Sequence, residues 1–327
     1  MPTSAIDAKD VAAIQAATAG VAVCDRSHWG RIRVSDDDRL RFLHNQSTND
    51  FQSLQPGQGC DTVMVSSTAR TIDLVSAYIL EDSVLLLTSP SRRESLFKWL
   101  DKYIFFADKV HLQDVTDETS TFSLIGAKSD AIVEKLGATE IIGKPYGSHQ
   151  QIDGVIVAVG SGLAEPGYTL ILPTSEKAQL WQQILELGAV ELSDRAWDML
   201  RILQGRPAPD AELTDDYNPL EVGLWQTISF NKGCYIGQET IARLNTYKGV
   251  KQYLWGIRLN APVEVGSTIT VGDEKVGKLT SYTETANGHF GLGYIRSKAG
   301  GVGLKVKIGE TEGEVVEVPF VSHEYPQ

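Results

Sequence analysis

The sequence predicts an α+β fold that is divided into more than one domain. A chain of 327 residues usually forms two or three domains, and 42% hydrophobic residues can supply each with a buried core. Helix and strand signals alternate up to about residue 250, where short strand signals separated by turns take over. These observations indicate mixed α+β units followed by a small antiparallel barrel or sandwich.

The N-terminal third predicts helices around an antiparallel meander. Helices are expected over residues 8–17, over a segment capped by Ser35 and Asp36, and over residues 92–103, where Leu96, Trp99 and Leu100 share one face. Strand-like segments follow one another closely, which favours antiparallel pairing. They span residues 31–34, 61–65, 71–80 and 84–88.

The middle of the chain predicts the order β-α-β-β-α-β, which is that of a split βαβ or ferredoxin-like unit. This fold has no single function attached to it. Strands are expected at residues 121–126, 155–160, 168–172 and 189–192, and helices at 129–137 and 175–187. A long helix should then span residues 193–204, because Ser193 and Asp194 are good caps and Gly205 with Pro207 is a good stop.

Composition limits the functional classes. A net charge of -12 disfavours extended contact with nucleic acid, and no apolar run approaches the ~20 residues that span a bilayer. Residues 1–10 lack the pattern of a secretory or transit signal, so we expect a cytoplasmic protein. The cysteines Cys24, Cys60 and Cys234 are odd in number and far apart, which indicates free thiols and no preformed zinc site.

The stretch NKGCYIGQETIA, residues 231–242, contains the first candidate site. Cys234 lies between two glycines just before an expected helix, whose N-terminus would favour the thiolate together with Lys232. Packing as a small hydrophobic residue is the alternative, and it is the reading that we favour for the other two cysteines. Because the glycines let a ligand approach the backbone, they favour a function for Cys234.

Three acidic or amide residues are further candidates. Asp73 interrupts an apolar strand, where it must face solvent or find a partner, and the two readings are about equally supported. Asn49 and Asp50 most often mean a turn or a helix end. The six histidines show no ligand spacing, so a zinc hydrolase has little support.

The segment NPLEVGLWQTISFNKGCYIGQETI, residues 218–241, resembles the YgfZ-type folate-binding proteins, which are relatives of the T-protein (aminomethyltransferase) of the glycine cleavage system. The element Lys-Gly-Cys-Tyr-x-Gly-Gln-Glu is the signature of that branch. FLHNQSTNDFQSLQPGQG, LRILQGRPAPDAELTDDYNPLE and RLNTYKGVKQYLWGI agree with it, so the resemblance covers nearly the whole chain. The sequence of these segments is most similar to that of cyanobacterial and chloroplast members.

The resemblance implies a three-domain ring of the aminomethyltransferase type around a hole that holds tetrahydrofolate or another reduced folate. Residues 1–115 with 195–248 would form a discontinuous folate-binding domain, 116–194 the ferredoxin-like domain, and 249–327 the barrel. Cys234 and Asp73 are then the candidates for catalysis. The candidates for folate binding are Asn49, Asp50, Asp73, Arg206, Glu221, Trp225, Lys232, Tyr235, Gln238 and Glu239.

Two departures from the T-protein pattern matter. T-proteins have a pterin-contacting glutamate in LRLEAG where this chain has Leu203, and a paired aspartate in DDL where it has Ile72 and Asp73. The resemblance therefore implies first an accessory protein that supports iron-sulfur enzymes, such as a tRNA-modifying methylthiotransferase. The alternatives are a folate-dependent aminomethyl or one-carbon transferase with Asp73 as the orienting carboxylate, and a non-catalytic scaffold.

Overall fold

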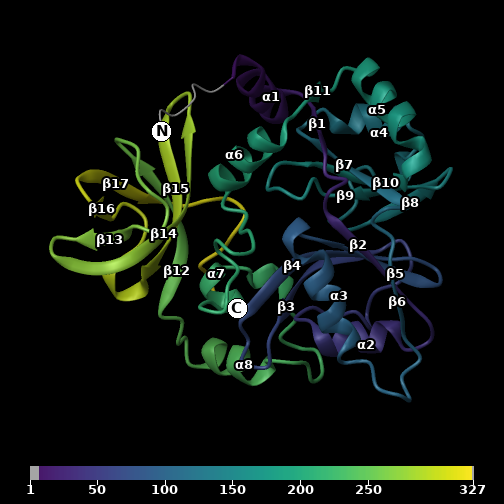
Figure 1. The fold of residues 1–327 in the computed structure, drawn as a ribbon, viewed down its shortest axis with the longest axis horizontal. Helices are drawn as coiled ribbons and strands as arrows, with labels where there is room; N and C mark the ends of the chain where they lie inside the picture. The colour runs from purple at the N-terminus through teal and green to yellow at the C-terminus, as the bar shows by residue number, and fades with distance from the viewer. Residues whose placement is uncertain (1–6, 326–327) are drawn as a thin grey trace.

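Three sheet-containing units surround the segment that runs from α6 to α7 (Figure 1). The computed structural model describes residues 7–325. Residues 1–6, on which part of the inference about a leader sequence rests, lie outside this range. No helix within residues 7–325 combines the length and apolarity that a bilayer crossing requires.

The first unit is an antiparallel sheet in the order β3-β4-β5-β2-β6. The predicted meander is confirmed as the consecutive strands β3, β4 and β5. Helix α2, which precedes the meander in the chain, and helix α3, which follows it, share one core with the sheet that includes Phe42, Met64 and Leu100. The elements are β2 (Gly30–Ser35), α2 (Arg39–Gln46), β3 (Gly59–Val65), β4 (Thr71–Ile79), β5 (Ser83–Thr88), α3 (Arg93–Asp101) and β6 (His111–Asp114).

The second unit is a six-stranded sheet in the order β11-β1-β7-β10-β9-β8. The predicted βαββαβ series is present, but β1 lies between β7 and β11, and β8 adds an edge strand. The sequence analysis missed both, because each has four residues and so shows no periodicity. The elements are α1 (Ala8–Ala19), β1 (Ala22–Asp25), β7 (Thr119–Ile125), α4 (Ser129–Lys135), β8 (His149–Ile152), β9 (Val155–Val159), β10 (Gly167–Pro173), α5 (Lys177–Glu186) and β11 (Val190–Glu191).

The C-terminal unit is a closed antiparallel barrel in the order β12-β15-β14-β13-β16-β17, as the turn-rich sequence predicts. A Cβ at Gly277 would lie 2.0 Å from the carbonyl oxygen of Tyr294, so only glycine allows the strands to approach there. The strands are β12 (Gln252–Leu259), β13 (Thr268–Val271), β14 (Glu274–Thr285), β15 (Gly288–Arg296), β16 (Lys305–Ile308) and β17 (Thr311–Val316).

Helix α6 (Asp194–Gln204) leads from the six-stranded sheet to the centre of the molecule (Figure 1). Both predicted ends are confirmed: Ser193 accepts a hydrogen bond from the N–H of Ala196, and Gly205 has a φ of 80°. The chain continues through α7 (Pro219–Val222) and α8 (Gln238–Thr246) to the barrel. Short 3-10 turns occupy Pro90–Arg92, Thr139–Ile141, Thr174–Glu176, Trp225–Thr227 and Ser297–Ala299.

Candidate functional site

A cavity of about 310 Å³ lies between the chain after β1, the loop after β5 and helix α6, and we call it the central cavity. This volume is in the lower range of small-molecule sites. Its lining comprises Cys24, Arg26, His28, Trp29, Ser89, Pro90, Ser91, Asp194, Trp197, Asp198, Arg201, Arg206, Ala208 and Pro209.

Two tryptophans and two arginines form one wall of the central cavity. Trp29 and Trp197 meet edge to face, with ring centroids 5.3 Å apart. The guanidinium carbons of Arg26 and Arg206 lie 4.5 and 5.0 Å from the ring centroid of Trp29, within the range of cation–π contacts. Burial, and after it the neighbouring Arg26, lower the pKa of Arg206 to about 10. The wall therefore combines two indole rings with two positive charges.

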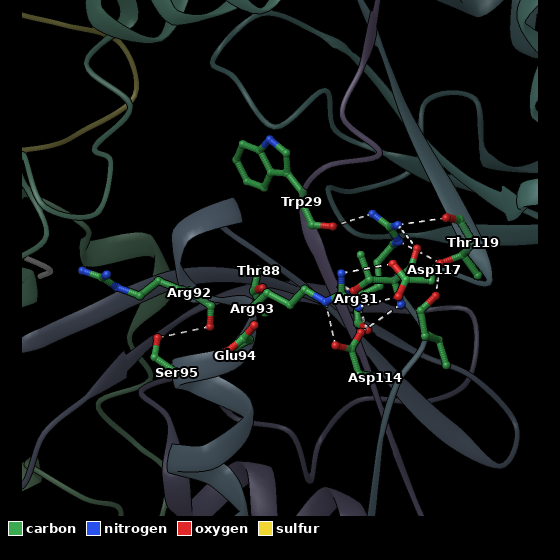
Figure 2. A network of polar contacts seen from close by, with 12 residues as sticks. Trp29, Arg31, Thr88, Arg92, Arg93, Glu94, Ser95, Asp114, Asp117 and Thr119 are labelled. Atoms are coloured by element: carbon green, nitrogen blue, oxygen red, sulfur yellow. Dashed lines mark hydrogen bonds and ion pairs between the residues drawn. The ribbon is translucent and has the colours of Figure 1, made fainter.

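A buried arginine holds Trp29 in place (Figure 2). Arg31 donates hydrogen bonds to the carbonyl oxygens of Trp29, Thr116 and Thr119, and Figure 2 shows the indole ring of Trp29 pointing away from this network. Arg93 forms ion pairs with Asp114 at 2.6 Å and with Asp117 at 3.0 Å. The bond from Arg31 fixes the backbone of Trp29, and the ring of Trp29 packs edge to face on Trp197.

Asp73 lies directly behind the cavity lining. The carboxylate is fully buried and accepts hydrogen bonds from the N–H of Ser89 at 2.9 Å and from its hydroxyl at 2.7 Å. The solvent-facing reading of Asp73 is therefore wrong. Burial raises the pKa of Asp73 to about 6, although both bonds from Ser89 oppose the shift. Asp73 can thus affect a ligand in the cavity through Ser89.

A second buried carboxylate joins the cavity to the barrel. Glu212 is fully buried, and its Oε1 accepts hydrogen bonds from the hydroxyls of Thr280 and Ser281, each at 2.6 Å. Its Oε2 accepts hydrogen bonds from Arg201 at 2.9 Å and from the N–H of Ala208 at 3.1 Å. Helix α6, the loop that follows it and strand β14 are therefore held together at one side chain.

The residues predicted around Cys234 lie outside the lining of the central cavity, in a segment that we call the lysine loop (residues 231–237). Lys232 donates from Nζ to the carbonyl oxygens of His44, Ser47 and Asn49 at 2.5, 2.8 and 2.6 Å, where α2 ends. The three acceptors match the three N–H bonds of an ammonium group and so favour the charged form of Lys232. Burial favours the neutral form and lowers the pKa of Lys232 to about 7. The acceptors identify Lys232 as the residue that fixes the loop after α2.

The geometry around Cys234 differs from the expectation in the direction of the Lys232 side chain. Helix α8 begins at Gln238 with Gly237 as its N-cap, so Cys234 lies outside the first turn. Lys232 turns its amino group towards α2 and stacks on Tyr235 at 4.7 Å. Cys234 itself is exposed. Cys234 therefore precedes the first turn of α8, and the amino group of Lys232 is engaged at the end of α2.

The other sequence-predicted residues lie at or near the lysine loop. Asn49 and Asp50 form the expected turn, in which Asp50 accepts from the N–H of Gln52 and lies 3.0 Å from His44. Of the remaining four, Trp225 shares an apolar cluster with Tyr235, and Glu221 belongs to the capping box of α7. Gln238 and Glu239 lie in the first turn of α8. None of these residues lines the central cavity.

Of the residues predicted from the sequence, Arg206 lines the central cavity and Asp73 lies behind Ser89, whereas Arg26, Trp29 and Trp197 were not predicted. These three are isolated in the sequence, and no spacing distinguishes them from ordinary core residues. Leu203, at the T-protein glutamate position, lines a different cavity of about 710 Å³ between α1, α6 and the barrel. Among residues 7–325, no group of three or more His, Cys, Asp or Glu side chains could hold a metal ion.

Comparisons with known proteins bear on both the fold and the family. The model of the GCVT N-terminal domain matches residues 4–232. A chloroplastic protein of Arabidopsis thaliana, named "Putative transferase", is 52% identical over 97% of this chain and 75% of its own length. An aminomethyltransferase of Desulforamulus reducens is 28% identical over 96% of this chain and 90% of its own.

The fold is that of the aminomethyltransferase T-protein. The crystal structure of glycine cleavage system aminomethyltransferase T from Bartonella henselae matches with a TM-score of 0.84 and 18% identity, over 97% of this chain and 91% of that one. The predicted three-domain α+β architecture with a C-terminal barrel is confirmed.

Proposed function

The chain belongs to the family of the GCVT N-terminal domain, and on that premise we propose that it binds a reduced folate in the central cavity and takes part in one-carbon transfer. The observation that supports this proposal is the wall of Trp29, Trp197 and the two arginines. A pterin or benzoyl ring requires planar apolar surfaces, and a glutamate tail requires cations. The residues present therefore fit this cofactor.

Tetrahydrofolate supplies amine nitrogens that carry the one-carbon unit. On the protein side, Ser89 donates its hydroxyl proton to Asp73, so its oxygen lone pairs remain free to accept an N–H from a ligand. Because the pKa of Asp73 is raised to about 6, this pair is in the range where a proton can move near neutral pH. We assign Asp73 a positioning role that acts through Ser89.

Calorimetric titration with tetrahydrofolate and folinic acid tests folate binding. We expect Ser89→Ala to weaken binding, whereas Cys234→Ala should bind as the wild type does, because Cys234 does not line the cavity. The transfer step is tested with an aminomethyl-lipoyl donor, where Asp73→Asn should reduce turnover and leave folate affinity nearly unchanged. A wild-type protein that binds folate but shows no transfer would remove the transferase part of the proposal.

A second candidate function is the support of iron-sulfur enzymes, which the resemblance to YgfZ-type proteins suggests. The observation that favours it is the exposed thiol of Cys234 on the lysine loop, which a client protein can reach. Cells that lack this protein should lose methylthiotransferase activity, and Cys234→Ser should fail to restore it while Cys60→Ser succeeds. Full rescue by Cys234→Ser would remove this candidate.

A further inference from the structure

Arg26 and Arg206, which we call the arginine pair, are buried positive charges without a direct carboxylate partner. Their residues are only 2% and 4% exposed. Arg26 donates to the hydroxyl of Thr169 at 3.3 Å, and Arg206 to the carbonyl oxygen of Gly162 at 2.6 Å. Among residues 7–325, no ion pair joins either arginine to a carboxylate. A buried charge in such surroundings is destabilising unless something compensates it.

The nearest carboxylates are already engaged. Asp61 accepts hydrogen bonds from the hydroxyls of Ser76 at 2.6 Å and Tyr146 at 2.9 Å, and Asp73 accepts two from Ser89. Both act on the arginine pair only through space. Burial and repulsion by Arg26 lower the pKa of Arg206. The surrounding carboxylates therefore do not fully compensate its positive charge.

Two buried donors of the same wall also have no acceptor in the described part of the chain. They are Nε of Arg26 and the indole N–H of Trp197. Buried donors are normally paired, so these two are available to an acceptor on a ligand in the cavity. Two acidic residues at the lining do not compensate the arginines, because Asp198 pairs with Arg201 at 2.7 Å and Asp194 is exposed at the start of α6.

Resting on the proposed folate site, we propose that the arginine pair, stacked on Trp29 and Trp197, is a carboxylate subsite of the central cavity. A guanidinium group binds a carboxylate through a planar fork, and the adjacent indole faces suit an aromatic group attached to it. The carboxylate is that of the glutamate tail of the folate or of a separate small carboxylate substrate. Arg26 and Arg206 then determine specificity for the acid over the uncharged analogue.

Quenching of tryptophan fluorescence tests the subsite, because Trp29 and Trp197 line the cavity. The probes are 5-formyltetrahydrofolate, 6-methyltetrahydropterin, which has no carboxylate, and p-aminobenzoylglutamate, which has no pterin. We expect Arg206→Gln to weaken binding of the first and third at least tenfold and to leave the second unchanged. Arg206→Lys, which keeps the charge and loses the fork, should recover part of the affinity.

Arg258→Gln is the matched control, because Arg258 is an exposed arginine that does not line the central cavity. Thermal unfolding of each variant shows whether it folds, and 5-formyltetrahydrofolate should raise the melting temperature of the wild type more than that of Arg206→Gln. If Arg206→Gln does not fold, Arg26→Gln takes its place with the same expectation.

The outcomes separate the two proposals. If the wild type binds 5-formyltetrahydrofolate and Arg206→Gln binds it equally well, the subsite is overturned and folate binding stands. If the wild type binds no folate but binds p-aminobenzoylglutamate through Arg206, the subsite stands with a separate carboxylate ligand and the folate proposal fails. If no probe binds, both proposals fail.

Discussion

The lysine loop and the arginine pair differ in how far the protein itself compensates a buried positive charge. At the lysine loop, three backbone carbonyl oxygens accept from Lys232, and Tyr235 covers the amino group. At the central cavity, the arginine pair stacks on tryptophans and leaves Nε of Arg26 without a partner. A cation that the chain satisfies by itself holds structure, whereas one that the chain leaves unsatisfied is available to a ligand.

The sequence favours the lysine loop as the binding site, whereas this difference favours the central cavity with its arginine pair. The signature motif begins in the lysine loop, where its lysine donates to backbone carbonyl oxygens at the end of α2 and stacks on its tyrosine. The central cavity is lined by Trp29 and Trp197, which lie in none of the segments that carry the resemblance, and by Arg206, which lies outside the signature motif. The contrast predicts that substitutions of Lys232 affect mainly stability and that those in the arginine pair affect mainly binding.

The largest effect is expected for Lys232→Met. This variant leaves three carbonyl oxygens at the end of α2 without their donor, so the free energy of unfolding should fall by about 4 kcal/mol. Urea unfolding followed by circular dichroism measures the loss. Lys305→Met, which removes an exposed ion pair to Glu314, is the control and should change little. An equally small change at Lys232 would contradict the structural assignment.

The second effect concerns pH and Asp73. Since burial raises the pKa of Asp73 from 3.8 to about 6, the folded state binds its proton more tightly than the unfolded state does. The stabilisation is fully present below pH 3.8 and is lost as the pH rises through about 6, a difference of up to about 3 kcal/mol. Asp73→Asn cannot ionise, so its unfolding free energy should lack this dependence across the same interval. Parallel pH profiles of wild type and variant would show that Asp73 carries no such shift.

A smaller effect is expected for Arg206→Gln. The variant loses a hydrogen bond to Gly162 and cation–π contacts, but it also removes a buried charge that faces Arg26. These terms oppose each other, so the free energy of unfolding should change by no more than about 1 kcal/mol. Arg201→Gln is the contrasting variant, because it breaks the ion pair with buried Glu212 and should lose about 3 kcal/mol. A loss of that size at Arg206 would make the arginine pair structural.

The smallest effect on stability is expected for Cys234→Ala, within about 0.5 kcal/mol, because Cys234 is exposed. Its thiol should react with iodoacetamide in the native protein, whereas burial raises the pKa of Cys24 and Cys60 to about 12 and should delay their labelling until unfolding. Peptide mass spectrometry reads out each site. Folate should not protect Cys234, and protection would show that the lysine loop contributes to the folate site after all.

Local signals predicted most of the fold correctly. Ser193 and Gly205 fix the ends of α6, and the turn-rich C-terminus forms the closed barrel, because caps and turns depend on residues a few positions apart. The same logic failed for β1 and β8, which are too short for a period and are strands only because the sheet supplies their partners. It also failed for Lys232, whose direction no neighbouring residue determines.

By itself, the sequence determined both ends of α6, the meander, the barrel and the resemblance to the T-protein relatives, since each rests on residues near one another along the chain. The predicted cap of α2 at Ser35 and Asp36 is wrong, because that helix begins at Arg39 with Asp38 as its N-cap. Only the tertiary structure decided that Asp73 is buried behind Ser89, that Lys232 joins a helix end 188 residues away, and that Arg26 and Arg206 share two tryptophans. Burial and charge compensation arise when distant segments pack together, and neither periodicity nor composition encodes which charges meet in that packing.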